Sequence, residues 1–484
     1  MKKNNVTDGL IWSFAERITA QLISTIVTII LARILTPEHY GVVSIVSVFT
    51  TICNVFVTSG FGSAIVQKKE IDELDLNTAF FTNLAIAALI YLIIFAASPV
   101  IGSFYDMPEL TAITRVMGLR ILLASVNTIQ QAVVRRQMAF KKFFWATLFG
   151  TLVSAVVGIA MALKGFGAWA LVAQYLTNTT IDTLVMSVVG GWRPKLQFSF
   201  FRAKEIMSFG WKVLAADLVS TSGNELRSML IGKVFGAEDL AYHDQGKKFP
   251  ALLVNNIIAA LNKVMLPVYS RSQEDIQRLK GMLRNSVQMG IFLLAPIMVG
   301  FACVADTFTT VVLTEKWLPC VPFIWIFCVS YLTRPIEASC HQALLAIGRG
   351  DIVLRIITSI NIASIASALI AIFVFESVLL VAVGSLLTTM TSLLLFMYFS
   401  KKLIGYSTRE QIADLAPALL VSAIMGGVVI FVKVLPLNAL PQLCLQVVIG
   451  VIAYILLSLA LKVPGSGNAL VMIKHFIKKV LEHK

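Results

Sequence analysis

Residues 9–35, GLIWSFAERITAQLISTIVTIILARIL, determine how the rest of the chain is interpreted. This run of 27 mostly apolar residues is long enough, at about 1.5 Å per residue, to cross a hydrocarbon layer of about 30 Å. Within it, Arg17, Gln21, Ser24 and Thr28 recur every three or four residues and therefore share one face of a helix. Because lipid cannot satisfy polar groups, such a face lines a water-filled cavity or a polar interior.

The same polar stripe recurs 200 residues later in the chain. In SFGWKVLAADLVSTSGNELRSMLIGKVFGAEDLAY (208–242), a polar residue stands 200 positions after each member of the first stripe: Asp217, Thr221, Asn224 and Ser228. The turn ARILTPEHYG (32–41) corresponds at the same offset to GKVFGAEDLA (232–241). We interpret the two segments as an internal repeat, and the alternative is a chance match of two short polar stripes.

The composition is that of a polytopic membrane protein. Of the 484 residues, 57% are hydrophobic and only 14% are charged, whereas about a quarter of a soluble domain is charged. The mean hydropathy is +0.84. The net charge of +14 is spread over short loops between apolar runs, which argues against a nucleic-acid partner.

Enzyme motifs are absent from the sequence. There is no GxxxxGK[ST] phosphate loop, no HExxH, no GxSxG and no large soluble domain. The five histidines are scattered without metal-ligand spacing, and the six cysteines contain no CxxC pair. We therefore expect a transporter without catalytic residues, metal site or cofactor, in which H⁺ or Na⁺ is the candidate coupling ion.

Short charged loops divide the chain into fourteen predicted transmembrane spans. The spans are 9–35, 41–66, 77–104, 110–133, 143–163, 168–190, 207–232, 249–269, 285–306, 319–346, 353–374, 378–400, 412–432 and 441–461. With both termini on one side, 26 Lys and Arg residues fall on that side and six on the other. The positive-inside rule then predicts that both termini are cytoplasmic.

The repeat and the span count together predict an all-α membrane protein built of two lobes. The first and seventh spans run in the same direction, so the repeats are related by a pseudo-two-fold axis along the membrane normal. We expect a six-helix lobe over residues 1–200, a second over 201–405 and two additional transmembrane helices over 406–462. Residues 463–484 have the pattern of a cytoplasmic amphipathic basic tail, or else of an ordinary solvated tail.

The buried charges are mostly cationic. Eight basic residues lie within or near the span interiors, and of these Arg33, Arg115 and Lys212 are close enough to span ends to reach the interface. The others are harder to explain in that way: Arg17, Arg120, Arg227, Lys263 and Arg334. Fewer acids are embedded: Glu16, Asp182, Asp217, Glu225 and Glu337. The surplus of cations favours an anionic cargo, and Arg17–Asp217 is the most attractive candidate for an internal ion pair.

Several blocks resemble the oligosaccharide flippases of the multidrug/oligosaccharidyl-lipid/polysaccharide exporter superfamily. They include TSGFGSAIVQKKEID, GFGAWALVAQYL, NELRSMLIGKVFGAEDLAYHDQGKKFP, VMLPVYSRSQED and ALLAIGRGDI, and the resemblance covers almost the whole chain. The branch that it resembles holds the colanic acid and teichuronic acid exporters.

The resemblance implies a two-lobed fold in the bacterial inner membrane. It also implies that undecaprenyl-diphosphate-linked oligosaccharide moves from the cytoplasmic to the periplasmic leaflet, with membrane lipids, a polysaccharide polymerase and glycosyltransferases as further partners. Sibling lipid II flippases use cations on the first helix, where Arg17 stands here.

Three functional hypotheses remain open at this point. In the leading one, cations hold the diphosphate and polar faces accept the sugar: Arg17, Gln21, Ser24, Arg120, Asn224, Arg227, Lys263 and Arg334. Acids would carry a coupling ion or form ion pairs: Glu16, Asp217, Glu225 and Glu337. The second is a cation-coupled drug or metabolite antiporter of the same fold, and the third is a scaffold for glycosyltransferases.

Overall fold

The computed structural model describes residues 3–68, 70–137, 139–272 and 274–465. All regular secondary structure in these ranges is helical. Contacts between helices divide the chain into two compact units, Met1–Ala241 (unit 1) and Tyr242–Lys484 (unit 2).

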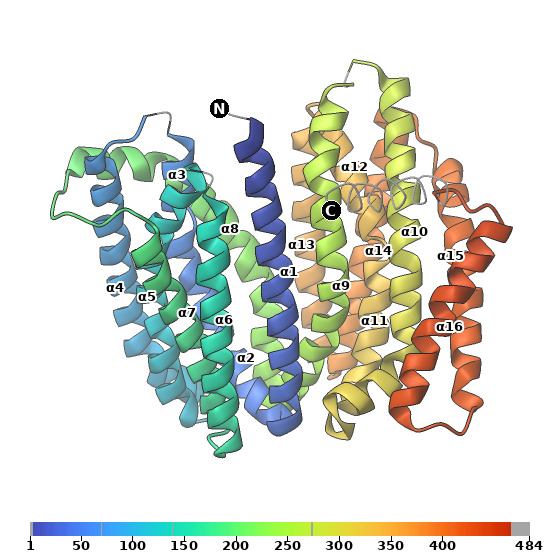
Figure 1. Ribbon diagram of the computed structural model, residues 1–484, viewed down its shortest axis with the longest axis horizontal. Coiled ribbons are helices and arrows are strands. Elements are labelled where there is room, and N and C mark those ends of the chain that lie inside the picture. The colour runs from blue at the N-terminus through green and yellow to red at the C-terminus, as the bar shows by residue number, and fades with distance from the viewer. Residues whose placement is uncertain (1–2, 69, 138, 273, 466–484) are drawn as a thin grey trace. The chain divides into compact units, whose positions relative to one another are not determined.

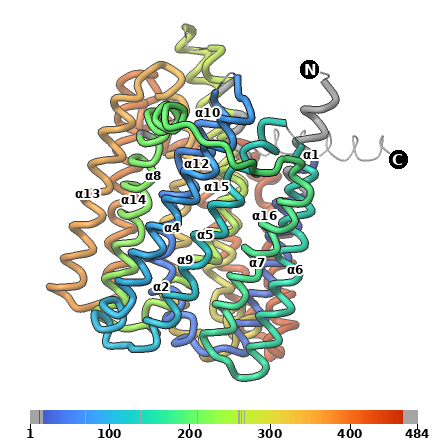
Figure 2. Tube along the Cα trace, turned by 90° about the vertical axis from the view of Figure 1, so that its left-hand side faces the viewer, coloured from blue at the N-terminus to red at the C-terminus, as the bar shows by residue number. Residues whose placement is uncertain are grey.

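Unit 1 is a bundle of long helices with one short helix inserted between the second and third long ones (Figure 1). The helices are α1 (Lys3–Ile34), α2 (Pro37–Thr58), α3 (Phe61–Gln67), α4 (Glu73–Phe104), α5 (Glu109–Arg136), α6 (Phe140–Leu163), α7 (Ala168–Val189) and α8 (Phe200–Val234). Helix α6 packs on α1 and α7, α5 packs on α2, α4 and α7, and α8 packs on α2, α3 and α4. Figure 2 shows α6 and α7 side by side.

Unit 2 contains most of α9 and all of the later helices. The helices are α9 (Ala237–Ser270), α10 (Ile276–Phe308), a π turn (Thr309–Leu313), a 3₁₀ helix (Glu315–Cys320), α11 (Val321–Tyr331), α12 (Arg334–Ala346), α13 (Gly350–Phe373), α14 (Val378–Ile404), α15 (Thr408–Phe431), a 3₁₀ turn (Val432–Val434) and α16 (Ala439–Ala460). Helices α15 and α16 pack on each other and on α10. Helix α9 begins in unit 1 and continues without interruption into unit 2.

Each of the fourteen predicted spans coincides with one helix or with consecutive helices. In the described part of the chain, eleven of these segments are long and apolar enough to cross a membrane. The three others are α7, α8 and α9, which carry more polar or charged residues. The all-helical membrane fold is therefore confirmed, while the count of fourteen spans stays a prediction.

Two predicted spans are broken rather than continuous. The span 41–66 consists of α2 and α3, which are separated at Ser59 and Gly60. Gly60 has a φ of 84°, which favours glycine, and its backbone packs on Gly210 of α8, where a Cβ atom would lie 2.8 Å from a carbonyl oxygen. The span 319–346 consists of a 3₁₀ helix followed by α11 and α12, with the last break at Leu332 and Thr333.

The two segments of the proposed repeat end and restart at corresponding positions. Helix α1 ends at Ile34 and α2 begins at Pro37, and α8 ends at Val234 and α9 begins at Ala237, again 200 residues later. The turns also meet in space, because a Cβ atom on Gly41 would lie 1.7 Å from the carbonyl oxygen of Ala237. Gly41 is thus required for the close approach of α2 to the first turn of α9.

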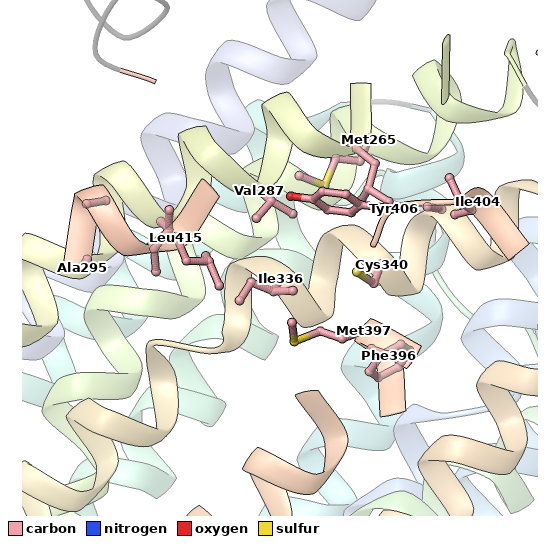
Figure 3. Close-up of a cluster of buried hydrophobic side chains, with 14 of the residues drawn as sticks. Met265, Val287, Ala295, Ile336, Cys340, Phe396, Met397, Ile404, Tyr406 and Leu415 are labelled. Carbon is pink, nitrogen blue, oxygen red and sulfur yellow. The ribbon is translucent and has the colours of Figure 1, made fainter. Parts of the chain in front are cut away.

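The largest cluster of buried apolar side chains described in unit 2 joins α10, α12, α14 and α15. Figure 3 shows Ile336 and Cys340 of α12 beside Met397 and Phe396 of α14. This cluster fixes the buried face of α12 and therefore the direction of the polar residues on the same helix.

The predicted limits of the two lobes, residues 200 and 405, remain a prediction. The predicted first lobe ends at residue 200, whereas contacts place α8 in unit 1 because it packs on α2, α3 and α4. The predicted tail 463–484 lies outside the described residues except for its first three positions.

Candidate functional site

A polar groove lies within unit 1 between α2, α5 and α7. It consists of two adjoining pockets of about 160 and 140 Å³, which share Ala124 and Thr179. The groove is lined mainly by hydroxyl, amide and guanidinium groups: Thr50, Thr51, Asn54, Thr58, Arg120, Asn127, Thr128, Gln131, Arg135 and Thr179. A groove of this kind inside a membrane-spanning unit is suited to a polar ligand rather than to lipid tails.

Arg120 of α5 is the cation of the first pocket. Its Nε donates to Thr179 Oγ1 at 3.2 Å, and its guanidinium carbon lies 5.1 Å from the centre of the Tyr175 ring. The Thr179 hydroxyl itself donates to the Tyr175 carbonyl oxygen at 3.0 Å, so its oxygen is free to accept from Arg120. No described carboxylate lies within 4 Å of the Arg120 guanidinium. The pocket therefore presents a positive charge that no acid in the described part of the chain neutralises.

Arg135 supplies a second cation at the other end of the groove. It stands fifteen residues after Arg120 on the same helix, which corresponds to about 22 Å at 1.5 Å per residue. Its guanidinium donates to Gln131 Oε1 at 3.2 Å and lies 5.8 Å from the centre of the Phe143 ring. The groove thus has a guanidinium near each end and neutral polar groups between them.

Asn127 connects the groove to a half-buried acid. Its side-chain amide donates to Asp182 Oδ2 of α7 at 2.6 Å, and its own oxygen, in a side chain that is 5% exposed, has no described hydrogen-bond partner. Glu16 of α1 is held separately, because Thr147 of α6 donates to it at 3.2 Å. Asp182 and Glu16 are thus both hydrogen-bonded on the side of unit 1 where α1, α6 and α7 pack together.

The side chains of the predicted polar stripe on α1 make few contacts with the other helices of unit 1. Arg17 and Ser24 are exposed, and Gln21 donates to Thr25 on the next turn at 3.4 Å. Helix α1 packs on α6, toward which Glu16 is directed. The stripe therefore lies on a helix face that unit 1 leaves accessible.

The predicted pair between Arg17 and Asp217 does not form. Both side chains are exposed, and among the described ion pairs neither contacts the other. The reason is that α1 packs on α6, whereas α8 packs on α2, α3 and α4. On α8, Asn224 is exposed and donates to the Ser220 carbonyl oxygen at 3.0 Å. Glu225 and Arg227 on this helix are half-buried.

In unit 2, two of the predicted site residues lie at the break between α11 and α12. Arg334 is exposed, with its guanidinium 5.7 Å from the centre of the Tyr331 ring. Glu337 is buried one turn further along the helix. The side chain of Lys263 lies outside the described residues.

Unit 2 also contains an apolar pocket of about 410 Å³ between α9, α10, α15 and α16. Its walls are almost entirely hydrocarbon, and Gln446 is the polar residue that lines it, along with Tyr454. The Tyr454 hydroxyl is directed to the Phe292 carbonyl oxygen at 2.7 Å. A pocket of this composition suits an alkyl or isoprenoid chain.

The predictions from sequence found one cation of the groove and missed most of its lining. Arg120 was predicted; Arg135 was assigned to a loop, and Asn127, Thr128, Gln131 and Thr179 were not predicted. A signal for them exists in the sequence, because polar residues follow Arg120 on α5 at spacings of three, four or seven residues.

Comparison with known proteins decides the family. Residues 30–322, more than half of the chain, match the family described as polysaccharide biosynthesis protein. The chain belongs to this family. Three curated proteins are similar to this chain over about two thirds or more of their length. The teichuronic acid biosynthesis protein TuaB of Bacillus subtilis (strain 168) is 24% identical over 72% of each chain. The succinoglycan biosynthesis transport protein ExoT of Rhizobium meliloti (strain 1021) is 24% identical over 67% of this chain and 66% of its own. The lipopolysaccharide biosynthesis protein WzxC of Escherichia coli (strain K12) is 22% identical over 72% of each.

Solved structures share the fold. The lipid II flippase MurJ in its inward closed conformation superposes with a TM-score of 0.75, covering 93% of this chain and 98% of its own at 13% identity. An inward-facing multidrug resistance transporter of the MATE family gives a TM-score of 0.59 at 15% identity, covering 80% of this chain and 94% of its own. Family and fold together identify a helical multi-pass membrane protein of the polysaccharide biosynthesis protein family.

Proposed function

We propose that this family member is a flippase that moves undecaprenyl-diphosphate-linked oligosaccharide from the cytoplasmic to the periplasmic leaflet of the bacterial inner membrane by alternating access. The proposal rests on the family, on the relatives' names and on a fold shared with a lipid II flippase. Both termini would be cytoplasmic, as the distribution of Lys and Arg predicts.

Arg120 is the observation that carries the proposal. It places a cation without a described acidic partner inside a membrane-spanning bundle, and such a charge is costly unless a ligand or water compensates it. A diphosphate provides adjacent oxygens that a guanidinium can bind with two hydrogen bonds. A cationic drug would be repelled at the same position, which favours the flippase over the antiporter.

The rest of the groove fits the sugar part of such a ligand. Thr and Asn side chains between Arg120 and Arg135 provide donors and acceptors of the kind that sugar hydroxyls need. The apolar pocket of unit 2 would hold part of the polyprenyl chain, because only hydrocarbon surface lines most of it.

The other residues predicted from the sequence are further candidate ligands of the cargo. Arg17, Gln21, Ser24 and Asn224 lie on exposed helix faces, where they remain available to the cargo. Arg227, Lys263 and Arg334 complete the predicted set of ligands. The acids Glu16, Asp217, Glu225 and Glu337 remain candidates for binding a coupling H⁺ or Na⁺, or for ion pairs, and a polymerase and glycosyltransferases remain candidate partners.

The test is leaflet accessibility of undecaprenyl-diphosphate oligosaccharide in vesicles that contain the purified protein. We expect protein-dependent appearance in the outer leaflet with wild type and with Lys164→Ala, an exposed loop cation that serves as the control. We expect no appearance with Arg120→Ala at equal protein content. Normal translocation by Arg120→Ala would contradict the assignment of the site, and extrusion of cationic dyes without movement of the lipid would establish the antiporter.

A further inference from the structure

At the break between α11 and α12, one hydroxyl oxygen contacts two hydrogen-bond acceptors, the Ser330 carbonyl and the Glu337 carboxyl. Helix α11 ends at Tyr331 and α12 begins at Arg334, with Leu332 and Thr333 between them. Broken helices inside membranes leave backbone carbonyls that need side-chain partners. Here the Thr333 hydroxyl supplies one, because its oxygen lies 2.9 Å from the Ser330 carbonyl oxygen.

The same hydroxyl has a second and closer contact. Thr333 Oγ1 lies 2.5 Å from Oε1 of Glu337, one turn further along α12. A threonine hydroxyl has a single hydrogen to donate, and a carbonyl oxygen can only accept. If the hydrogen of Thr333 goes to Ser330, the contact at 2.5 Å requires that the Glu337 carboxyl donates, and only the protonated acid can do so.

No described ion pair serves Glu337, and the guanidinium of Arg334, the cation one turn earlier, is exposed. The side chain is 9% exposed, and its neighbours on α12, Ile336 and Cys340, belong to the apolar cluster of Figure 3. An ionised acid that is buried without a charged partner is strongly disfavoured, and a bound proton removes this cost.

The charged and titratable groups near Glu337 come from its own helix and the adjoining break. Arg334 precedes it by one turn, but its guanidinium is exposed and directed toward Tyr331, and no described ion pair joins the two side chains. Cys340 and His341 follow it on α12, and Tyr269 of α9 lies near Cys340. In the described residues of α10, α13 and α14, the charged groups stand near the helix ends, and none is paired with Glu337.

We infer that Glu337 is a proton-binding site and that its protonation closes the break between α11 and α12. If the proposed function holds, the consequence is that the coupling ion of the transporter is H⁺ rather than Na⁺, and this consequence alone rests on the proposed function. With the proton bound, the Glu337 carboxyl donates to the Thr333 oxygen, and the Thr333 hydroxyl donates to the Ser330 carbonyl oxygen. When the O–H bond breaks and the proton leaves, Thr333 can satisfy either the carboxylate or the carbonyl but not both. Loss of the proton therefore loosens the break, which gives the helix two states.

The proton can be observed directly, without any transport. Infrared difference spectroscopy of the full-length protein in lipid at neutral pH reports the carbonyl stretch of protonated carboxyl groups. We expect such a band in wild type and in Glu315→Gln, an exposed acid that serves as the control, and its loss in Glu337→Gln. Thr333→Val, which removes the acceptor, should shift the band to the frequency of a more weakly bonded carboxyl. A wild-type spectrum that Glu337→Gln leaves unchanged would overturn the inference.

The coupling is then tested in vesicles that contain undecaprenyl-diphosphate oligosaccharide. An imposed pH gradient should accelerate translocation by wild type and by Glu315→Gln, and should have no effect on Glu337→Gln. Acceleration of Glu337→Gln by the pH gradient, or of wild type by a Na⁺ gradient alone, would overturn the assignment of the coupling ion. Failure of wild type to move the lipid under any gradient would reject the proposed function instead, while the infrared band would still report whether Glu337 holds a proton.

Discussion

Asp414 of α15 accepts two hydrogen bonds from the single guanidinium of Arg284 on α10, at 2.6 Å from Nε and 2.7 Å from Nη2. Gln288 and the Tyr406 hydroxyl donate to the same carboxylate at 2.7 and 2.8 Å, so that four donors converge on one buried acid. Two parallel bonds of this kind are among the strongest that side chains make. The arrangement ties α15, one of the two additional helices, to the rest of unit 2.

Removing this carboxylate should destabilise unit 2. Asp414→Ala leaves the buried hydroxyl of Tyr406 without its acceptor, which costs about 1–3 kcal/mol, and the half-exposed Arg284 charge adds little because water can solvate it. We expect a lower midpoint of thermal unfolding in detergent, with the exposed acid Glu315→Ala unchanged as the control. An equal midpoint for Asp414→Ala and wild type would show that the four-donor arrangement contributes nothing.

Gly41 should tolerate no side chain. A Cβ atom there would lie 1.7 Å from the Ala237 carbonyl oxygen, so Gly41→Ala has to displace α2 from the first turn of α9. The matched control is Gly223→Ala on α8, where a Cβ atom meets nothing within 4 Å and helix propensity improves by about 1 kcal/mol. We expect the thermal midpoint to fall for Gly41→Ala and to hold or rise for Gly223→Ala. A reversed order would mean that the turns do not meet as described.

The geometry of Arg120 should matter as well as its charge. Arg120→Lys keeps the charge but loses the planar fork that binds two phosphate oxygens. One hydrogen bond to a charged group is worth about 1.5–3 kcal/mol, so we expect about a 10- to 100-fold lower affinity for the lipid-linked diphosphate. The measurement is the lipid concentration at half-maximal translocation, with Lys164→Arg as the control. A lysine variant with unchanged affinity would limit Arg120 to a general electrostatic role.

Acid should weaken the beginning of α4 through Asp72. The backbone N–H of Asp75 donates to Asp72, and this bond, helped by Arg202 and Lys68, lowers the pKa of the Asp72 carboxyl below its ordinary value. A lowered pKa in the folded state means that the stabilisation is complete above the unfolded pKa and is lost as the pH falls through the folded one. Asp72→Ala should therefore unfold at lower temperature than wild type near neutral pH, and the difference should vanish at strongly acidic pH. A difference that is independent of pH would exclude the carboxylate as its cause.

The sequence predicts the helices of this protein well because their signal is local. Apolar runs of sufficient length mark the spans, but they do not predict the break at Gly60 inside the span 41–66, although the sequence SGFG is a local signal for it. The 200-residue offset also places the two turns after α1 and α8 correctly.

Most of the candidate site could not be predicted, because its contacts join helices far apart in the chain. Asn127 and Asp182 are separated by 55 residues, and nothing local to either indicates the other. The predicted pair Arg17–Asp217 fails for the same reason, since the repeat relates the two positions in sequence but says nothing of which helices α1 and α8 pack on. Arg120 was found because a cation inside an apolar run is unusual wherever its partners lie.

The boundary between the two units falls inside α9 and not in a loop. The two units are therefore connected by a continuous helix and not by a flexible loop. Pro250 stands nine residues after the boundary and lacks the amide that would bond the preceding turn. Because of this missing amide, this part of α9 is where the helix that joins the two units bends most easily.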